Sequence, residues 1–412
     1  MDTSLYYDIV IIGSGMAGLY SALQIKKLCP SLSFIVLEKN HTFASKSYNV
    51  QFEGTSVVTG AGIGRKKKDK LLLSLMKQFD VPIQTFETGH HFAPSIHPPC
   101  DPKTTFFHIK NSYEKEKSTI HIPFKDYAKK LLGPTNYEHF IQCSGYSDFE
   151  NEDVYDTLYH YGFDDNYDKW IGFSVPWKML VDKIVSSLHN HIVNNTEVTS
   201  IHQHEHFFEI LTKGNQHKTY YCEKVIIATD IDSLQHLIQP IIANPSIYNE
   251  IKGQPFLRLY AKFSKDSIPY LQQVIKGVTV IPGPMQKVIP MNPEKGVYMI
   301  IYSDNDDANY FKKYFKNNEK NRNYLKNMME KSLELEGKLD ILSIQAFYWK
   351  NGTHYYTPLQ SKFKNREEFI DKAQHPHKNI LVVGELISQN QGWVEGALES
   401  VKKTLTKQWL QC

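Results

Sequence analysis

The feature that most constrains this chain is a glycine-rich turn near its amino terminus, placed between a strand pattern and a helix pattern. Residues 7–12 form an apolar, β-branched run typical of buried parallel strands, and apolar residues recur at helical spacing from Leu19 onward. The turn between them reads Gly13-Ser14-Gly15-Met16-Ala17-Gly18. Glycines at this spacing permit a tight turn, close approach of the backbone to a pyrophosphate, and close packing of helix on strand. The pattern predicts a β–α–β unit whose turn binds a dinucleotide.

An acidic residue follows at the distance that a dinucleotide site requires. A second buried-strand pattern at 34–37 ends at Glu38, about 20 residues after Gly18. The Glu38 carboxylate is expected to accept hydrogen bonds from ribose hydroxyls, and Lys39 beside it is counted among the cofactor-binding residues. Because a carboxylate repels a 2′-phosphate, a plain adenosine dinucleotide is expected. The helix start adds unpaired N–H groups and a positive dipole end for the phosphates.

A second strand–turn–helix pattern lies at the far end of the chain. Residues 379–384 have the pattern of a buried strand, and this strand ends at Gly384-Glu385. After a short polar stretch, a helical pattern begins with Gly392-Trp393-Val394-Glu395-Gly396-Ala397. This second helix start, which could also bind an anion, therefore follows an acidic residue, Glu385, at the end of a strand.

Together the two patterns resemble the flavin-containing amine oxidoreductases, the family of the monoamine and polyamine oxidases. In that family the last strand ends in Gly-Glu, and the last helix starts with an aromatic residue followed by x-Glu-Gly-Ala. The resemblance implies that FAD is the cofactor. It also implies that Glu385, next to Gly384, lies near the ribityl chain, and that the backbone of Trp393 and Val394 meets the pyrimidine edge of the flavin.

Two further segments carry the same resemblance. The segment at 59–64 resembles the family's glycine–alanine loop, which passes beside the flavin ring. Its expected cofactor-binding residues are Gly60, Ala61 and Gly62. The strand pattern at 197–201 resembles the strand whose backbone meets the adenine, which implies a contact at Val198.

The resemblance implies an α/β fold with two domains. One is a Rossmann-like FAD-binding domain, a doubly wound parallel sheet built from three separate stretches of chain. The other is an α+β substrate domain with a mixed sheet over the flavin. The expected boundaries are 1–75, 172–250 and 378–412 for the first domain, and 76–171 and 251–377 for the second. Strand patterns in the second domain lie at 256–263, 297–302 and 342–349, and a helical pattern runs from 307 to 336.

Two basic positions depart from the family pattern. Most members carry an arginine that neutralises the pyrophosphate, and this chain has Lys46 there, a point charge without a bidentate fork. Amine-oxidising members carry a lysine on a substrate-domain strand that holds a water against flavin N5. The best match for that position is Arg258, with Lys262 as second choice. Arg258 is expected to orient water, a substrate carboxylate or the flavin. The basic run at 65–68 is expected to be a solvated face.

Aromatic side chains are expected to flank the substrate in front of the flavin. The family takes one from the last helix start, here Trp393, and another from a few residues after a tryptophan, here Tyr355 or Tyr356. Aromatic faces exclude water and tolerate a cationic amine. His354 stands where some members attach the flavin through cysteine, so non-covalent FAD is expected.

The resemblance implies an enzyme, most directly an amine oxidase. Hydride would pass from the amine α-carbon to flavin N5, water would hydrolyse the imine, and oxygen would be reduced to peroxide. A small-molecule amine and oxygen are therefore the expected partners. One alternative is a related flavoprotein of another reaction class, such as a desaturase, a porphyrinogen oxidase or a sugar mutase, and Arg258 in place of lysine favours it. Another is a non-catalytic member that keeps the flavin as a structural or binding element.

Composition argues against other classes. The 47 basic and 44 acidic residues leave a formal charge of +3, which is low for a nucleic-acid binder, and no run approaches the ~20 apolar residues of a membrane helix. The amino terminus lacks the pattern of a signal peptide, so a soluble, cytoplasmic protein is expected. The five cysteines form no C-x-x-C pair, which argues against a disulfide framework or a structural zinc site.

Two polar clusters remain. His202, His204 and His206 alternate along one strand face and are expected to face solvent, so no metal site is expected. Residues 148–168 hold eight acidic residues. They are expected to form a solvated surface, or else to steer a cationic polyamine toward the site.

Overall fold

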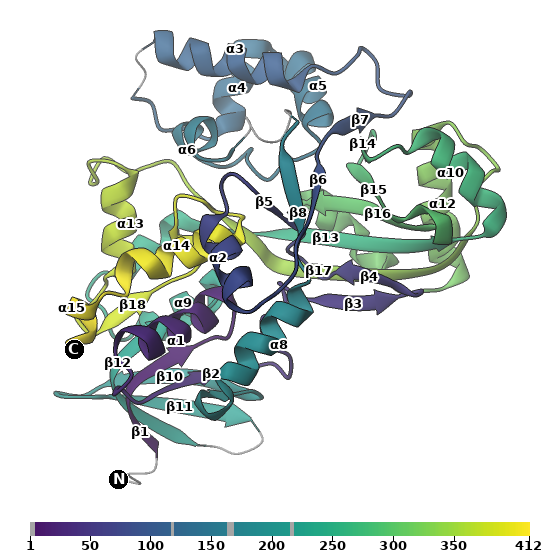
Figure 1. Cartoon of the computed structure of the whole chain (residues 1–412). Helices are drawn as coiled ribbons and strands as arrows, with labels where there is room; N and C mark the ends of the chain where they lie inside the picture. Colours follow the sequence, from purple (N-terminus) through teal and green to yellow (C-terminus); the bar gives the residue numbers. More distant parts are fainter. Residues whose placement is uncertain (1–4, 117–118, 163–168, 215–217) are drawn as a thin grey trace.

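The buried strand patterns assemble into a seven-stranded sheet at the base of the molecule (Figure 1). In the computed structural model, which describes residues 5–116, 119–162, 169–214 and 218–412, the sheet has the order β10-β11-β12-β1-β2-β9, and β18 pairs with β12. Its strands are β1 (Tyr6–Ile12), β2 (Phe34–Leu37), β9 (Ile192–Val193), β10 (Thr196–Gln203), β11 (Phe208–Gly214), β12 (Thr219–Ile227) and β18 (Ile380–Val382). The pairs β1–β2, β1–β12, β2–β9 and β12–β18 are parallel, whereas β10, β11 and β12 are antiparallel to one another in turn.

Helices cover both faces of this sheet because the side chains of β1 alternate between two apolar cores. Ile9 and Ile11 belong to the core that contains α1 (Met16–Leu28), α2 (Lys70–Gln78), α8 (Trp177–Ser187) and α14 (Val394–Thr404). Val10 and Ile12 belong to the core that contains α9 (Ile231–Ile238) and α13 (Arg366–Gln374). A mostly parallel sheet buried on both faces is the doubly wound arrangement expected from the sequence.

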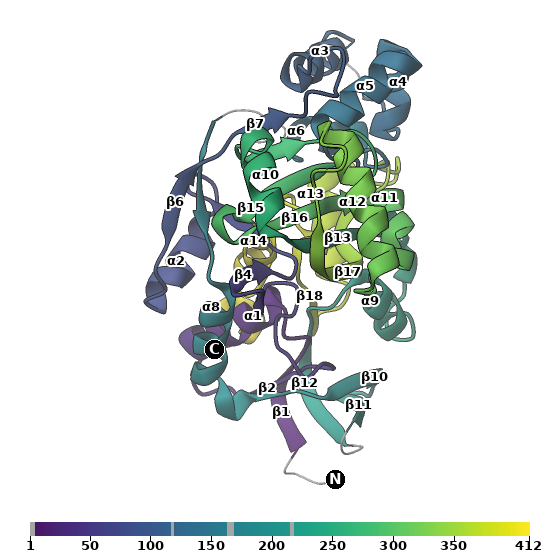
Figure 2. The same cartoon turned by 90° about the vertical axis from the view of Figure 1, so that its right-hand side faces the viewer.

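A second, mixed sheet of six strands has the order β17-β13-β16-β15-β14-β7. Its strands are β7 (His90–Phe92), β13 (Ile251–Phe263), β14 (Val278–Val280), β15 (Lys287–Asn292), β16 (Val297–Asp304) and β17 (Ile341–Tyr356). The helices α10 (Ile268–Val274), α11 (Asn305–Tyr310) and α12 (Glu319–Leu333) lie beside this sheet, and α11 and α12 share an apolar core with one face of it (Figure 2). The strand patterns at 256–263 and 297–302 therefore become the central strands β13 and β16, and the pattern at 342–349 becomes the edge strand β17.

A group of four helices lies at the top of the molecule in both views and has an apolar core of its own (Figures 1 and 2). These helices are α3 (Pro102–Lys115), α4 (Phe124–Leu132), α5 (Pro134–Ser144) and α6 (Val154–Tyr159). There are also two small sheets in the described chain. One pairs β3 (Asn49–Phe52) with β4 (Thr55–Val58), and the other has the order β5 (Ile63–Arg65), β8 (Ile171–Ser174), β6 (Gln84–Glu87). The short helix α15 (Lys407–Leu410) ends the chain.

The helical pattern expected from 307 to 336 is not one helix. It forms α11, the 3₁₀ turn Phe311–Tyr314, and then α12, whose start is capped by the Asn318 side chain accepting from the N–H of Asn321. Asparagine competes for backbone hydrogen bonds and so favours helix starts over helix interiors, which accounts for the break.

The expectation that the cysteines do not pair was wrong. Cys29 is bonded to Cys412 and Cys100 to Cys143, although the first pair is separated by 383 residues. The carboxyl-terminal helix α15 packs back against the core of α1, and this tertiary contact leaves no trace in cysteine spacing. His139 lies beside the second pair, and one ligand atom from each of Cys100, His139 and Cys143 lies within 4.8 Å of the other two.

The acidic segment at 148–168 is not simply a solvated surface. Glu152, Asp153 and Asp156 are 6%, 0% and 3% exposed. Arg366 donates to Asp156 at 2.7 Å and to Asp153 at 3.2 Å, so the two aspartates form a buried ion-pair network between α6 and α13. Asp164, Asp165 and Asp168 lie outside the described residues.

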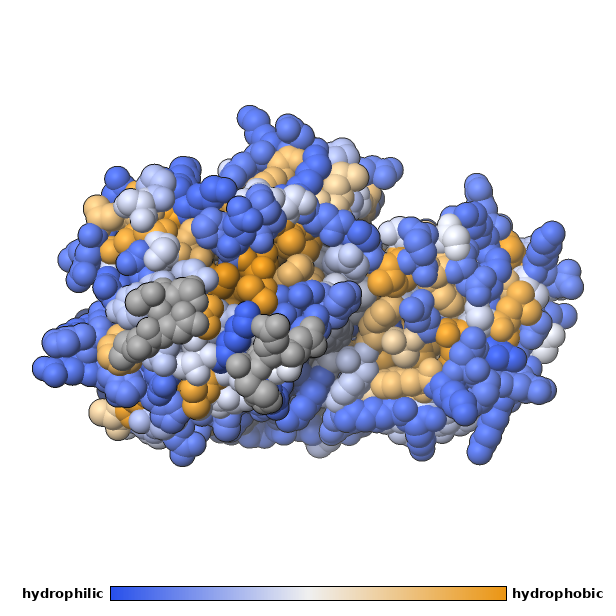
Figure 3. Space-filling model, turned by 90° about the horizontal axis from the view of Figure 1, so that it is seen from below, coloured by the Kyte–Doolittle hydropathy of each residue, from blue (hydrophilic) through white to orange (hydrophobic). Residues whose placement is uncertain are grey.

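Within the described residues, no helix combines the length and the apolar character needed to cross a bilayer. The space-filling view from below shows two lobes joined by a narrower waist, with hydrophilic side chains around the rim and apolar patches on each lobe (Figure 3).

Candidate functional site

The glycine turn is tight where it meets the sheet and open where it meets solvent. Gly13 has φ +99°, and a Cβ there would lie 2.5 Å from the carbonyl oxygen of Ala228. A Cβ on Gly18 would lie 1.9 Å from the oxygen of Gly13. Around Gly15, in contrast, nothing lies within 4 Å of an added Cβ, and no side chain caps the start of α1 that it precedes. The turn thus presents uncapped N–H groups to an open space, which suits a phosphate group.

The carboxylate of Glu38 holds this turn by hydrogen bonds. Its Oε2 accepts from the N–H of Ser14 at 2.9 Å and from the Ser14 hydroxyl at 2.7 Å, while Oε1 accepts from the N–H of Asn40 at 2.8 Å. Ser14 is fully buried, and Met16 and Ala17 are nearly so, each 5% exposed. A carboxylate has about four lone-pair sites, so room for a ribose hydroxyl remains. The structure therefore adds a role for Glu38 in holding the turn.

Lys39 and Lys46 lie near the same edge but differ in surroundings. Lys39 is exposed, with Nζ 3.8 Å from Asp230. Lys46 Nζ donates to the carbonyl oxygens of Asn351 at 2.9 Å and Gly352 at 3.3 Å. Burial lowers the pKa of Lys46, and the carboxylates of Glu385 and Asp230 oppose this effect.

Glu385 lies at the end of β18 and is held by a histidine that the sequence did not assign to it. Its Oε1 lies 2.8 Å from Nδ1 of His354, and the N–H of Ile231 points to Nε2 of the same ring at 3.4 Å. The ring therefore carries its proton on Nδ1 and donates it to Glu385. Burial alone would raise the pKa of Glu385, but His354 and Lys46 outweigh burial and the pKa lies below its usual value. Gly384 before it has φ +139° and donates its N–H to Ser400 Oγ.

The glycine–alanine loop is clamped by aromatic donors. Trp349 Nε1 donates to Thr59 O at 2.8 Å, Trp177 Nε1 to Gly62 O at 3.3 Å, and the Tyr260 hydroxyl to Val58 O at 2.7 Å. The N–H of Ala61 donates to Lys46 O, and a Cβ on Gly60 would lie 2.6 Å from the same oxygen. Gly62 is exposed, with nothing within 4 Å of an added Cβ. The loop is thus held by side-chain donors at its carbonyl groups and is open at Gly62, where a planar group would fit.

Trp393 precedes the first residue of α14, Val394, and both are half-buried. The guanidinium carbon of Arg65 lies 3.8 Å from the Trp393 ring centroid, and its nitrogens donate to Asp69 at 2.7 and 2.9 Å. Arg65 is 5% exposed, so the prediction of a solvated basic run fails at its first residue and holds for the exposed Lys66, Lys67 and Lys68. The available signal in the sequence was Asp69, which follows Arg65 at the four-residue spacing of an ion pair.

The two tyrosines of β17 have different surroundings. Tyr356 is 2% exposed, packs against Phe369 and donates its hydroxyl to Ser388 O at 2.9 Å. That position in the core does not fit the substrate-flanking role predicted for Tyr356. Tyr355 is half-buried and has its pKa raised by burial and by Glu152.

Arg258 lies on β13 and is 7% exposed. Its guanidinium carbon is 4.3 Å from the Phe256 ring centroid and 3.5 Å from that of Tyr302. Val198 lies on β10, half-buried beside a register irregularity in the pairing with β11.

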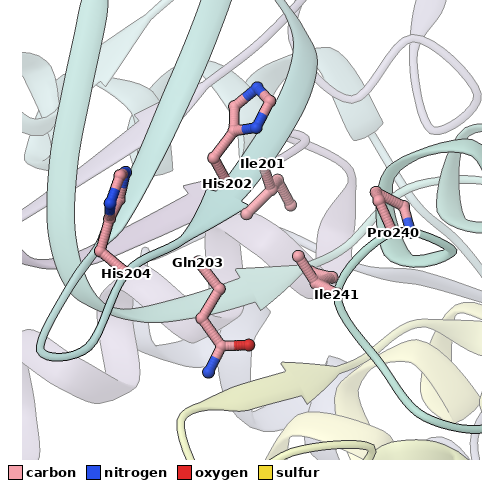
Figure 4. Close-up of a pocket in the computed structure, with 6 residues that line it drawn as sticks. All are labelled: Ile201, His202, Gln203, His204, Pro240 and Ile241. Carbon is pink, nitrogen blue, oxygen red and sulfur yellow. The ribbon is translucent and has the colours of Figure 1, made fainter.

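A surface groove beside β10 contains two of the histidines considered as metal ligands (Figure 4). His202 hydrogen-bonds with Ser200, whereas His204 stacks on Phe207 and lies 3.6 Å from Glu209. The two rings have separate partners, and both are exposed, as the sequence predicted. The prediction that the three histidines share a strand face was wrong, because β10 ends at Gln203 and only His202 lies on it.

No family model matches the chain, and no curated protein matches it. Solved structures do match over its full length. A double mutant from a redesign of cofactor binding in putrescine oxidase has a TM-score of 0.76 at 12% identity, covering 99% of this chain and 100% of that one. A single mutant from the same work gives 0.77 at 12% identity over 99% of each chain. Wild-type putrescine oxidase bound to putrescine gives 0.74 at 12% identity over 97% of this chain and 98% of that one. The chain has the putrescine oxidase fold, which confirms the predicted fold class and, at the level of the fold, the resemblance seen in the sequence.

Proposed function

We propose that this chain is an FAD-dependent oxidoreductase of the amine oxidase type. The observation that carries the proposal is the meeting of three strand ends at one edge of the parallel sheet. β1 ends just before the open turn around Gly15, β2 ends just before Glu38, and β18 ends three residues before Glu385. Ligands of doubly wound sheets bind at such an edge, outside the carboxyl ends of the strands.

The residues present fit a flavin dinucleotide. The uncapped start of α1 and Lys46 would hold the pyrophosphate, Glu38 the ribose, Glu385 the ribityl chain, and Val198 the adenine. The exposed side of Gly62 and the start of α14 would accommodate the flavin ring. Non-covalent attachment is proposed because His354, where some relatives carry a cysteine, uses both ring nitrogens in hydrogen bonds.

When bound, FAD would supply hydride acceptance from the carbon beside an amine and the transfer of those electrons to oxygen. The chain's own contribution is positioning and exclusion of water. Trp393, held by Arg65, and Tyr355 would border the substrate. Tyr260, Trp349 and Trp177 fix the loop on which the ring would rest. The exact position of each reacting atom depends on these rigid supports.

A second candidate is a flavoprotein of another reaction class, of the desaturase, porphyrinogen oxidase or sugar mutase type. The buried guanidinium of Arg258 favours it, since amine-oxidising relatives carry lysine there. The third candidate is a protein of this fold that binds the flavin but catalyses no reaction.

The visible spectrum of the purified protein tests these candidates. A yellow flavin that bleaches anaerobically when an amine is added would support amine oxidation. A yellow flavin that no amine reduces would favour the other two classes. Gly15→Val is expected to fold and lose the flavin, because its side chain would fill open space, whereas the matched Gly89→Val, also in open space, should stay yellow. A yellow Gly15→Val protein would contradict the site.

A further inference from the structure

Two basic side chains are buried on the same face of the six-stranded sheet without an acidic partner. Arg258 on β13 is 7% exposed and Lys287 on β15 is 1% exposed. Within the described parts of the chain, no carboxylate lies at ion-pair distance from either group. The Nζ of Lys287 has no hydrogen-bond partner, and Arg258 donates to the carbonyl of Leu257 at 3.2 Å. Burying a cation without a counter-ion is costly, so this arrangement calls for an anion.

The nearest carboxylates are occupied by neutral donors. Asp304 accepts from the N–H of Ser147 at 3.2 Å, from Gln286 Nε2 at 3.1 Å, and from the Ser147 hydroxyl. Asp148 accepts from the hydroxyl of Tyr161. Both carboxylates attract Lys287 from beyond contact distance, but burial dominates and lowers its pKa.

Aromatic rings bring the two cations together. The Tyr302 centroid lies 3.5 Å from the guanidinium carbon of Arg258 and 4.6 Å from Nζ of Lys287. The centroid of the Tyr146 ring lies 2.7 Å from Nζ of Lys287. Ring faces attract cations but leave the net positive charge in place. An anion bound at this ring would pair with Arg258 and would oppose the effect of burial, which lowers the pKa of Lys287.

Arg258 lies beside the loop where the flavin ring is proposed. Side chains two residues apart on a strand share a face, so Arg258 lies between Phe256 and Tyr260. The Phe256 ring lies 3.1 Å from the position of a Cβ on Gly60, and Tyr260 donates to Val58 O. Both neighbours of Arg258 therefore contact the segment from Val58 to Gly60.

We propose that Arg258, supported by Lys287, binds a carboxylate of the substrate, so that the substrate class is amines that carry an acidic group, such as amino acids. The planar fork of arginine matches a carboxylate bidentately, and Lys287 adds positive charge behind it. In an α-amino acid the carboxylate is attached to the carbon that bears the amine, which would place that carbon between Arg258 and the loop. A diamine would instead bring a second ammonium group to two buried cations. The oxidation itself rests on the proposed function, whereas the anion site does not.

Benzoate, a carboxylate that offers no amine to oxidise, tests the site in the flavin-loaded protein. Its binding is followed by calorimetry and by the shift of the oxidised flavin spectrum. We expect saturable binding that Arg258→Met weakens about tenfold or more and Lys287→Met weakens by a smaller factor. Lys252→Met, which removes an exposed cation from the same strand, should bind as the wild type does. Replacing a buried unpaired charge by methionine should preserve the fold, which circular dichroism checks.

The outcomes separate the two proposals. If benzoate binding depends on Arg258 and no amine reduces the flavin, the anion site stands and the proposed oxidation fails. If amines reduce the flavin but benzoate does not bind, or binds equally to Arg258→Met, the anion site is overturned. Faster flavin reduction by putrescine than by any amino acid would also overturn it.

Discussion

The guanidinium carbon of Arg65 lies 3.8 Å from the centroid of the Trp393 ring, and the two residues belong to opposite ends of the chain. Asp69 fixes Arg65 by accepting from its Nε, its terminal nitrogen and its backbone N–H. The aromatic side chain proposed to border the substrate is therefore oriented by an ion pair in which both partners are buried.

Asp69→Asn should destabilise the protein by about 3 kcal/mol, because it takes the carboxylate away from a buried guanidinium. The midpoint of chemical unfolding measures this loss. The double variant Arg65→Met with Asp69→Asn removes both charges together and should lose less than the single change. Equal losses would mean that the pair contributes nothing beyond packing.

Trp393→Ala should slow anaerobic flavin reduction by about tenfold or more while changing FAD affinity far less, since a misplaced substrate reacts slowly. Stopped-flow absorbance and FAD titration give the two numbers. Trp409→Ala, at a tryptophan that contacts Lys378 and Lys224 instead, serves as the control. Unchanged reduction in Trp393→Ala would remove this residue from the site.

The glycines of the turn should separate into two classes on substitution by alanine. Gly13→Ala and Gly18→Ala should each cost about 2 kcal/mol or more of folding free energy, because the new Cβ meets backbone atoms at 2.5 and 1.9 Å. Gly15→Ala should leave the stability of the cofactor-free protein nearly unchanged. Thermal unfolding without added FAD distinguishes the classes, and a large loss for Gly15→Ala would show that this space is not open.

Asp148 should make stability fall as the pH rises toward neutrality. Burial and the nearby Asp304 raise its pKa to about 7, against an unfolded value of about 4. A raised folded-state pKa means that the stability from the protonated form is complete below about pH 4 and lost as the pH approaches 7. Asp148→Asn should reduce the loss between pH 5 and 8 by about 1–3 kcal/mol in denaturant titrations. Asp156, with a pKa of about 6, should keep part of the slope.

Local patterns predicted the parts of this protein that depend on neighbours in sequence. The strand before Gly13, the helix after it and the acid at position 38 could be predicted because burial, spacing and turn chemistry act within about 30 residues. The pairing of His354 with Glu385 and the stacking of Arg65 on Trp393 depend on tertiary contacts, so spacing gave no sign of them. Tyr356 resembled a site residue by its distance from Trp349, yet packing against Phe369 decided its direction.

The same limit applies to Arg258. The family resemblance pointed to Arg258, but only the structure shows that Lys287, from another strand, shares its aromatic neighbour and that neither has an acidic partner in the described chain. The domain boundaries stay a prediction.

The central position of β1 has a consequence for how the protein is made. This strand is synthesised before the other strands of its sheet, its neighbour β12 follows more than 200 residues later, and β18 and α14 follow later still. The carboxylate of Glu395 on α14 also caps the start of α2 by accepting from the N–H groups of Leu71 and Leu72. The core that α1 shares with α2 and α14 therefore cannot be completed on the ribosome until α14 has emerged. A nascent chain lacking its final 35 or so residues should expose apolar strand edges and depend on chaperones.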